Sequence, residues 1–363
     1  MTTPRFVDLS GAPHTDPELW EPVTFTAAEI SAEIERLASE PQPANGRRES
    51  AFVHPRSTEP GLGLAPGIAV KLSVLLPGEQ TVPVRQNSTQ LDFCIRGEGR
   101  SLVGDRVVRY SQYDAFNIPS YRVYQHFNDS DDLLVRLSYS NAPLLEKMYV
   151  HFVEENPVEA PVAASDEAGE DAPENHSPYG ILDIGGGAKL MPYELLISPP
   201  SVESPALHWP WKDVNRHLEE LAALGETYRG RRLYLLYNDM TGRTNGTTPS
   251  FFSTITIRPA EIVDRPHRHV SAAINYYFAG HGYSRVAGRK YEWSAGDLML
   301  SAPGWAIHNH ASGSERVYEM TIQDQPLNIA MESLLWQEDL KHPARLLGAT
   351  AGFDTNRSQV GSR

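Results

Sequence analysis

The sequence is short of cysteine, of positive charge and of long apolar runs, and each shortage excludes a class of protein. Cys94 is the single cysteine among 363 residues, so no disulfide framework exists within the chain and nothing requires an oxidising compartment. Lys and Arg number 32 against 46 Asp and Glu; the net charge of −14 argues against nucleic acid or an anionic membrane as a partner. The polar, Pro-rich start has no signal-peptide core, and no apolar run reaches the roughly 18 residues of a membrane helix. We therefore expect a soluble, cytoplasmic protein.

What the sequence does contain is a group of histidines in the second half of the chain. They form two His-x-His pairs, in the segments PHRH and IHNH: His267, His269, His308 and His310. Residues i and i+2 of a β-strand point to the same face. If the two segments lie on neighbouring antiparallel strands, the four imidazoles converge on one face, while Arg268 and Asn309 point away. The pattern indicates a metal site on a sheet.

The residues between the two pairs explain how the pairs come together. They read as short strands rich in aromatic and β-branched residues, separated by the turn segments AGHG and SAGD. The expected strands cover residues 274–278, 283–286, 290–293 and 298–300. Short antiparallel strands joined by tight turns are typical of a small jelly-roll barrel.

The same layout occurs earlier in the chain, which indicates an internal duplication. IRGEG (95–99) aligns with FAGHG (278–282), and SYRVYQH (120–126) aligns with GWAIHNH (304–310). The positions that correspond to the four histidines hold Arg85, Asn87, Tyr124 and His126. These four cannot form a three-imidazole site, so they make either a structural polar cluster or a small-anion or regulatory pocket.

The duplication and the composition divide the chain into six parts. The expected parts are an N-terminal arm and helix (1–66), a first barrel without metal ligands plus a helix (67–155), an acidic Pro/Ala-rich linker (156–203), a helical segment (204–232), a metal-binding barrel with a closing helix (233–336) and a C-terminal tail (337–363). We expect the arm to pack on a barrel or on a partner subunit.

These motifs resemble the cupin superfamily, in which an HxH pair is followed by GD, Pro-Gly and a final His. The Glu that usually follows the HxH is missing, since Ala273 and Ile274 stand there, and this resembles the three-histidine cupins. HRHVSAAINY and GDLMLSAPGWAIHNHAS are similar to the motifs of the gentisate, salicylate and 1-hydroxy-2-naphthoate 1,2-dioxygenase family. The resemblance implies an all-β-dominated bicupin: two jelly-roll barrels with a few peripheral helices.

The resemblance also implies a ligand set and a metal. His267, His269 and His308 match the family's metal ligands, Fe(II) is the implied metal, and His310 would point into the same cavity without ligating. There His310 would act as a catalytic residue, accepting a phenolic proton or donating a hydrogen bond to reacting oxygen. Two alternatives stay open: His310 is the ligand and His308 is packed, or the second pair belongs to the core.

Four further residues are candidates for the substrate pocket: Asn275, Tyr276, Trp305 and Arg258. Asn275 stands where the family has an Arg that is implied to grip the substrate carboxylate, and a neutral amide lacks both the charge and the fork of a guanidinium. Arg258 could supply a substitute contact. Unlike the relatives, which carry the metal in the N-terminal barrel, this chain keeps its histidines in the C-terminal one.

The donor set predicts the type of ligand. Three neutral imidazoles leave about three coordination positions open and a divalent charge uncompensated, which favours an anionic, bidentate aromatic substrate beside O2. The interpretation is an Fe(II)-dependent dioxygenase that cleaves the ring of a hydroxylated aromatic compound and forms a homo-oligomer, a dimer or tetramer. A decarboxylase, an isomerase, a non-aromatic dioxygenase and a non-catalytic binding protein with a closed four-histidine metal remain alternatives.

Overall fold

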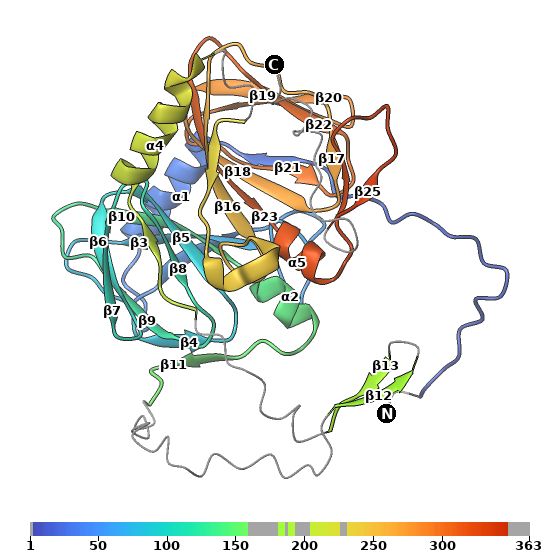
Figure 1. Ribbon diagram of the computed structural model, residues 1–363. Helices are drawn as coiled ribbons and strands as arrows, with labels where there is room; N and C mark the ends of the chain where they lie inside the picture. Colours follow the sequence, from blue (N-terminus) through green and yellow to red (C-terminus); the bar gives the residue numbers. More distant parts are fainter. Residues whose placement is uncertain (1–2, 159–180, 186–187, 193–203, 226–230, 348–363) are drawn as a thin grey trace.

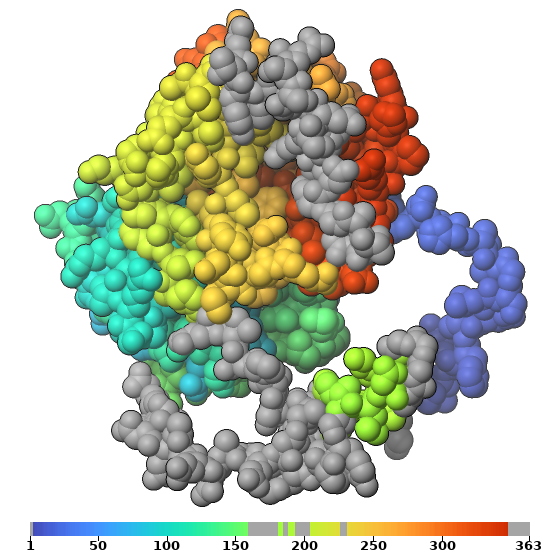
Figure 2. Space-filling model, viewed as in Figure 1, coloured from blue at the N-terminus to red at the C-terminus, as the bar shows by residue number. Residues whose placement is uncertain are grey.

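The chain forms two antiparallel β-barrels that pack side by side (Figures 1 and 2). The computed structural model describes residues 3–158, 181–185, 188–192, 204–225 and 231–347. Strands dominate these ranges, and the few helices are short and lie at the periphery. The prediction of an all-β chain with two barrels is confirmed.

The first barrel consists of a six-stranded and a five-stranded sheet. The six-stranded sheet has the order β14 (His208–Trp209), β8 (Ala115–Ile118), β5 (Gln90–Arg96), β10 (Leu134–Ser140), β3 (Ala69–Leu75) and β2 (Arg48–Phe52). The facing sheet has the order β11 (Val153–Glu155), β4 (Val84–Gln86), β9 (Val123–Phe127), β6 (Glu98–Val103) and β7 (Arg106–Ser111). Alternation along β10 sends Leu137 and Tyr139 to the core shared with the second barrel, so Arg136 and Ser138 face the interior of their own barrel.

The second barrel repeats this plan around the histidines. Its six-stranded sheet has the order β1 (Val23–Phe25), β21 (Leu298–Pro303), β18 (Ala272–Ala279), β23 (Val317–Gln323), β16 (Phe252–Arg258) and β15 (Leu233–Leu235). The opposite side is formed by β20 (Arg289–Ser294), β19 (His281–Val286) and β22 (His308–Ser312), and by β17 (Arg268–His269), β24 (Leu335–Gln337) and β25 (Arg345–Leu346). The histidine segments therefore lie on the sheet side that faces away from the first barrel (Figure 1).

An aromatic core joins the two barrels. The Phe93 ring of β5 lies 6.1 Å from the Tyr276 ring and 5.6 Å from the Phe278 ring, both on β18. Tyr113 adds a ring 4.7 Å from Phe278. Because these side chains are buried and interleaved, the barrels share one apolar core and do not behave as separate domains.

Each barrel completes its six-stranded sheet with a strand from the other repeat. β1 precedes the first barrel in sequence but pairs with β21 of the second, whereas β14 precedes the second barrel and pairs with β8 of the first. The following helices are tied in the same way: Ala27 N–H of α1 (Ala27–Ser39) donates to Asp297 Oδ1 (2.7 Å), and Trp211 N–H of α4 (Trp211–Ala223) donates to Asp114 Oδ1 (2.6 Å). The two repeats therefore exchange equivalent arms.

Strands of the two barrels continue into the parts that the sequence predicts to be arm, helix and tail. The N-terminal arm was expected to cover residues 1–66, but β2 lies inside it and pairs with β3 along its whole length. The helix expected at the end of residues 67–155 covers only α2 (Ala142–Lys147), because β11 follows and pairs with β4. The segment 204–232 begins with β14, so its helix is only α4. The arm does pack on a barrel, through β1.

The end of the second barrel also differs from the expectation. The closing helix is α5 (Gln325–Ala330), which stops before β24, and β24 pairs with β17 beside the histidines. Part of the expected tail is β25, which pairs with β24. Two further elements are the 3₁₀ helix η3 (Asp239–Thr244) and a hairpin of β12 (Leu182–Gly185) and β13 (Ala188–Leu190). Much of the expected linker and the end of the tail, residues 159–180, 186–187, 193–203 and 348–363, lies outside the described residues.

None of the helices within the described residues is long and apolar enough to cross a membrane.

Candidate metal centre

Three histidines of the second barrel come together at one point. His267 and His308 form an antiparallel bridge, in which His267 N–H donates to His308 O (3.0 Å) and His308 N–H donates to His267 O (2.9 Å). His269 follows two residues after His267 and shares its face because side chains of a strand alternate. One ring nitrogen from each of the three lies within 4.8 Å of the others, and all three side chains are buried.

Backbone carbonyls orient each of these imidazoles. His267 Nδ1 lies 3.0 Å from Arg265 O, His269 Nδ1 lies 2.8 Å from Ser271 O, and His308 Nδ1 lies 2.9 Å from Ala306 O. A carbonyl oxygen can only accept, so Nδ1 carries the proton in each ring and Nε2 presents its lone pair. These carbonyl contacts fix the tautomer and the orientation of each ring, as hydrogen bonds to metal-binding histidines do.

Burial keeps the three imidazoles neutral. It lowers the pKa of His267 and of His269 well below the ordinary value of 6.5, and the pKa of His308 to about 4. The group of potential ligands contains no carboxylate among the described residues. Neutral, oriented nitrogen donors fit a transition-metal ion such as iron, copper, nickel or zinc, and they leave its charge uncompensated.

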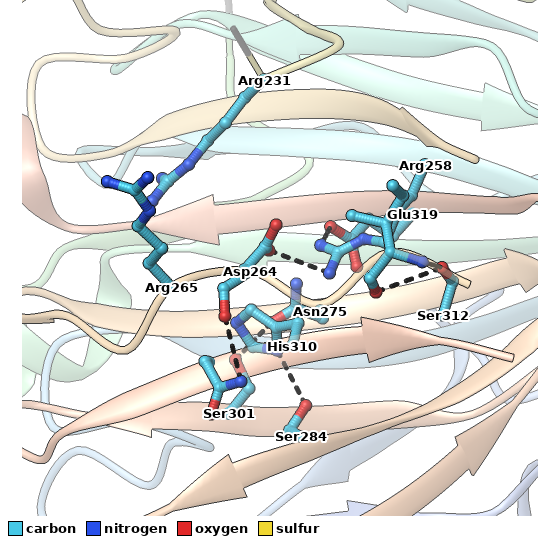
Figure 3. A network of polar contacts seen from close by, with 12 residues as sticks. Arg231, Arg258, Asp264, Arg265, Asn275, Ser284, Ser301, His310, Ser312 and Glu319 are labelled. Atoms are coloured by element: carbon cyan, nitrogen blue, oxygen red, sulfur yellow. Dashed lines mark hydrogen bonds and ion pairs between the residues drawn. The ribbon is translucent and has the colours of Figure 1, made fainter. Parts of the chain in front are cut away.

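His310 lies beside this group but not in it. Its ring centroid is 5.8 Å from that of His308, on the same face of β22, and its Nδ1 is 2.8 Å from Ser284 Oγ on β19 (Figure 3). Burial lowers the pKa of His310 well below 6.5 as well. The arrangement is one of three clustered histidines and a fourth neutral imidazole at the margin.

Sequence reasoning missed two residues around the centre, Trp336 and Arg231. Trp336 stacks on His269 (ring centroids 4.9 Å apart) and on His267 (6.1 Å), because β24 places it directly opposite His269 in the sheet. Arg231 Nη2 lies 3.4 Å from His267 Nε2 and 3.5 Å from Glu338 Oε1. Both come from segments outside the repeated barrel motif, and no local pattern points to them. Arg231 puts a guanidinium at the nitrogen that would ligate a metal.

Comparisons with known proteins agree with this architecture. A family model for the AraC-like ligand binding domain matches residues 253–351, which include the three histidines. The salicylate 1,2-dioxygenase from Pseudaminobacter salicylatoxidans superposes with a TM-score of 0.72 over 91% of this chain and 93% of its own, at 18% identity. The gentisate 1,2 dioxygenase 1 of Aquipseudomonas alcaligenes is 25% identical over 269 residues, 72% of each chain.

This chain is a bicupin that resembles the gentisate and salicylate 1,2-dioxygenases. A third relative, the 5-nitrosalicylic acid 1,2-dioxygenase of a Bradyrhizobium species, is 28% identical over 135 residues, 36% of this chain and 63% of its own. The resemblance drawn from the motifs is therefore confirmed.

Asn275 of the bicupin faces the interior of the second barrel and is satisfied there. Its Nδ2 donates to Thr321 Oγ1 (2.8 Å), and its Oδ1 accepts from the Ser301 hydroxyl (Figure 3). With both ends of the amide engaged and the side chain 2% exposed, Asn275 braces β18 against β21 and β23. It does not replace the carboxylate grip that an Arg would supply.

Arg258 is also a poor substitute for the Arg that the resembled family carries at the position of Asn275. It is buried, and its guanidinium is paired with two carboxylates: Nη1 to Asp264 Oδ2 (2.9 Å) and Nη2 to Glu319 Oε1 (2.8 Å; Figure 3). Its charge is thus neutralised from within the barrel wall. A contact between Arg258 and a substrate carboxylate stays a prediction, and this pairing disfavours it.

Two aromatic candidates point away from the centre. Tyr276 follows Asn275 on β18, so it faces the opposite side and packs in the core between the barrels. Trp305 stacks under the guanidinium of Arg268 (4.3 Å), the residue that alternates away from the histidines. Among the described residues, the indole ring that stacks on the clustered histidines is that of Trp336.

The first barrel holds no comparable centre. Arg85 pairs with Glu154 of β11 (2.5 Å), and Asn87 donates to Val150 O, just before that strand. Tyr124 and His126 share the inner face of β9, with ring centroids 5.3 Å apart, and His126 Nδ1 contacts Ser101 Oγ (2.7 Å). Because Arg85 and Asn87 are engaged elsewhere, the four positions do not form one cluster, which favours the structural interpretation over an anion pocket.

Proposed function

We propose that this bicupin is an Fe(II)-dependent dioxygenase that cleaves the ring of a hydroxylated aromatic acid. The observation that carries the proposal is the cluster of three neutral imidazoles without a carboxylate, next to the guanidinium of Arg231. His267, His269 and His308 would hold the iron through Nε2. The iron, when bound, would bring the substrate oxygens and O2 together so that both oxygen atoms of O2 enter the ring-opened product.

The residues of the chain would bind and orient the substrate. Arg231 would pair with a carboxylate, because its guanidinium lies at the edge of the histidine cluster and offers a planar fork of donors. The Trp336 ring, stacked on two of the imidazoles, would shield the centre from water and offer an apolar wall to an aromatic ring. The relatives support this substrate class: one acts on gentisate by name, and the salicylate 1,2-dioxygenase has been crystallised as adducts with gentisate.

The alternative of a purely structural metal would need a closed ligand set. The fourth imidazole, His310, is engaged through Nδ1 with Ser284 and stands outside the group of clustered ligand atoms. A centre of three ligands leaves positions open for a substrate, and this favours catalysis.

The test is reconstitution of the metal-free protein with Fe(II) under anaerobic conditions. Gentisate, salicylate, 5-nitrosalicylate and catechol would then be added separately, and oxygen uptake and the near-ultraviolet absorbance of a ring-opened product followed after air is admitted. We expect oxygen uptake with at least one carboxylated phenol, and none with the His267→Ala variant. His281→Ala is the matched control, since His281 lies on the surface with its side chain 48% exposed. Absence of oxygen uptake with every compound would refute the proposal.

A further inference from the structure

An apolar patch, which we call the β11 patch, lies on the surface of the first barrel between α2 and β11. Its members are large apolar side chains that are 47% to 84% exposed: Tyr121, Met148, Tyr149, Val150, Phe152 and Val153. The rings of Tyr121 and Phe152 lie 6.2 Å apart, so the patch is continuous from β9 to β11. It exposes on the order of 600 Å² of mostly apolar surface, as much as the largest patch on a typical monomer. A patch of this size indicates an interaction surface.

The chain holds this patch in a fixed shape. Asn87 N–H donates to Phe152 O (3.1 Å), Asn87 Nδ2 donates to Val150 O (2.8 Å) and Asn87 Oδ1 accepts from Phe152 N–H (2.8 Å). Tyr121 and Tyr149 both have a left-handed backbone, with φ of 63° and 59°. Bulky residues rarely adopt this conformation, and it is concentrated at functional sites. The patch is therefore formed in advance, and a partner would not have to order it on binding.

The second barrel provides a comparison, because its equivalent segment is polar. Tyr149 (φ 59°) follows the last residue of the cap of α2, as Glu332 (φ 55°) follows that of α5, so the two residues are equivalent. The next residues along the chain are Val150 and Ser333, and both are exposed. Two exposed positions that are polar in the second barrel are therefore apolar in the first.

The outer edge of β11 is open beside the patch. β11 lies at the margin of the first barrel, and no strand within the described residues pairs with its outer side (Figure 1). The corresponding strand of the second barrel, β24, is covered on that side by β25. On the side of β4, the backbone hydrogen bonds use Phe152 O and Asn156 N–H. Alternation along the strand therefore turns the backbone groups of Val153 and Glu155 outward, where they can pair with another strand.

The charged residues of β11 leave this edge accessible. Edge strands are commonly protected by charges that discourage pairing. Glu154 pairs with Arg85 (2.5 Å) of the same chain. Glu155 pairs in the same way with Arg47. Both carboxylates are thus compensated within the chain, whereas β7, the opposite edge of the same sheet, carries the exposed Arg109.

We propose that the β11 patch and the outer edge of β11 form an interface between two copies of this chain, related by a two-fold axis. Such an axis, perpendicular to the sheet, places β11 of one copy antiparallel to β11 of the other, which is the orientation that β24 and β25 have in the second barrel. A standard interface buries about 800 Å² per partner, and the patch would supply most of that area. A second copy satisfies the strand edge and the apolar patch at once. The interface lies in the barrel without the histidine cluster and does not rest on the proposed function.

The first test is the mass of the full-length protein by light scattering at micromolar concentration. We expect the parent to have at least twice the mass of one chain. Val153→Pro removes an outward N–H and leaves the bonds to β4 in place, and Met148→Glu/Tyr149→Glu puts two carboxylates into the patch. We expect each variant to halve the mass while the circular dichroism spectrum stays that of the parent.

Met331→Glu is the matched control for the charged variant. Met331 ends the cap of α5 as Met148 ends that of α2, their exposed fractions are 58% and 52%, and Glu332 already supplies the second carboxylate. We expect Met331→Glu to keep the mass of the parent. A monomeric parent, or a mass that is unchanged in either variant of the patch, would overturn the proposal.

The second test uses cross-linking and does not depend on a disruptive variant. Val153→Cys places a thiol on β11, and Val107→Cys places one on β7 as the control, at side chains that are 48% and 50% exposed. The native Cys94 is buried, so the introduced thiol is the one that a short bismaleimide reaches. We expect a covalent dimer from Val153→Cys and none from Val107→Cys. Absence of a dimer from Val153→Cys would mean that another part of the chain or a different protein covers the patch, and would refute the proposal, as would equal yields from both variants.

Discussion

Arg136 and Asp92 form an ion pair inside the first barrel, with Arg136 Nη1 2.5 Å from Asp92 Oδ2 and both side chains at most 2% exposed. Asp92 lies opposite Ser138 just as Asn275 lies opposite Thr321 in the second barrel, so the two positions are equivalent. Arg136 stands two residues before Ser138, as Glu319 stands two residues before Thr321, so Arg136 and Glu319 also occupy equivalent positions. The barrel that lacks the metal ligands therefore has its own charge pair in its interior, and the barrel that has them holds a neutral amide at the Asp92 position.

Breaking this pair on one side should destabilise the protein strongly. Asp92→Asn leaves the Arg136 charge buried and unpaired, and we expect the free energy of unfolding to fall by about 3–5 kcal/mol. Asp92→Leu combined with Arg136→Met should recover most of that loss, because it removes both charges. Urea denaturation measures both effects. The exposed pair Lys290–Glu292 is the control, and removing it should leave the urea midpoint nearly unchanged. A loss in Asp92→Asn no larger than in the control would contradict the expectation.

Removal of any clustered histidine should remove the metal. Replacing His267, His269 or His308 by Ala takes away one of three nitrogen donors. Loss of a residue that only hydrogen-bonds a metal ligand typically lowers metal affinity about 10–100-fold, and we expect loss of a ligand itself to lower it at least as much. Elemental analysis after dialysis should show about one divalent ion per chain in the parent and little in the variants. Two ions per chain, or one ion that persists in the His267→Ala/His269→Ala double variant, would be incompatible with a single centre.

Arg231 should determine the preference for a carboxylate. Replacing Arg231 by Ala should raise KM for a carboxylated phenol about 10–100-fold, the loss of about 1.5–3 kcal/mol expected for a charge-assisted hydrogen bond. KM for catechol, which has no carboxylate, should change little. Arg231→Lys keeps the charge without the planar fork and should recover only part of the affinity. Arg232, which donates to Gly225 O (2.6 Å), supplies the neighbouring control. Equal effects of Arg231→Ala on both substrates would exclude the carboxylate contact.

Asp324 should make stability depend on pH. Burial raises the pKa of Asp324 from 3.8 to about 7 in the folded protein. Between these two values the folded state keeps a proton that the unfolded state has lost, so stability falls as pH rises through this range and stays low above about pH 7. Asp324→Asn preserves the acceptor for Ala272 N–H (2.8 Å) and removes the charge. We therefore expect the free energy of unfolding of the variant, relative to that of the parent, to rise by up to about 4 kcal/mol between pH 4 and pH 8.

Denaturation of both proteins at these two pH values measures the difference. Asp213→Asn is the control, because the Asp213 side chain is 62% exposed, and it should change the free energy of unfolding equally at both pH values. The same result for Asp324→Asn would rule out a raised pKa.

The strand period of two predicts that the histidines cluster, as they do in the structure, and the same period divides the pocket candidates. The rule that brings His267 and His269 to one face also separates Asn275 from Tyr276, which are consecutive on β18 and cannot both face the centre. Trp305 could not be placed from sequence, because it follows the Gly304 turn (φ 102°), where alternation no longer holds. Arg231 and Trp336 reach the centre through contacts between distant segments, which a repeat pattern does not encode.

The exchange of arms between the two repeats has a consequence for how the chain is synthesised. β1 is synthesised well before its partner β21, which begins at Leu298. At the usual 5–20 residues per second, β1 waits on the order of 15 to 55 s before β21 exists. During that time the first barrel can close with β14 as soon as residue 209 is available, whereas the edge of β1 must stay unpaired. Until β21 is made, β1 is therefore a strand with unpaired backbone groups that could pair with a wrong partner. The polar, Pro-rich residues before Val23 stand where they can discourage such pairing.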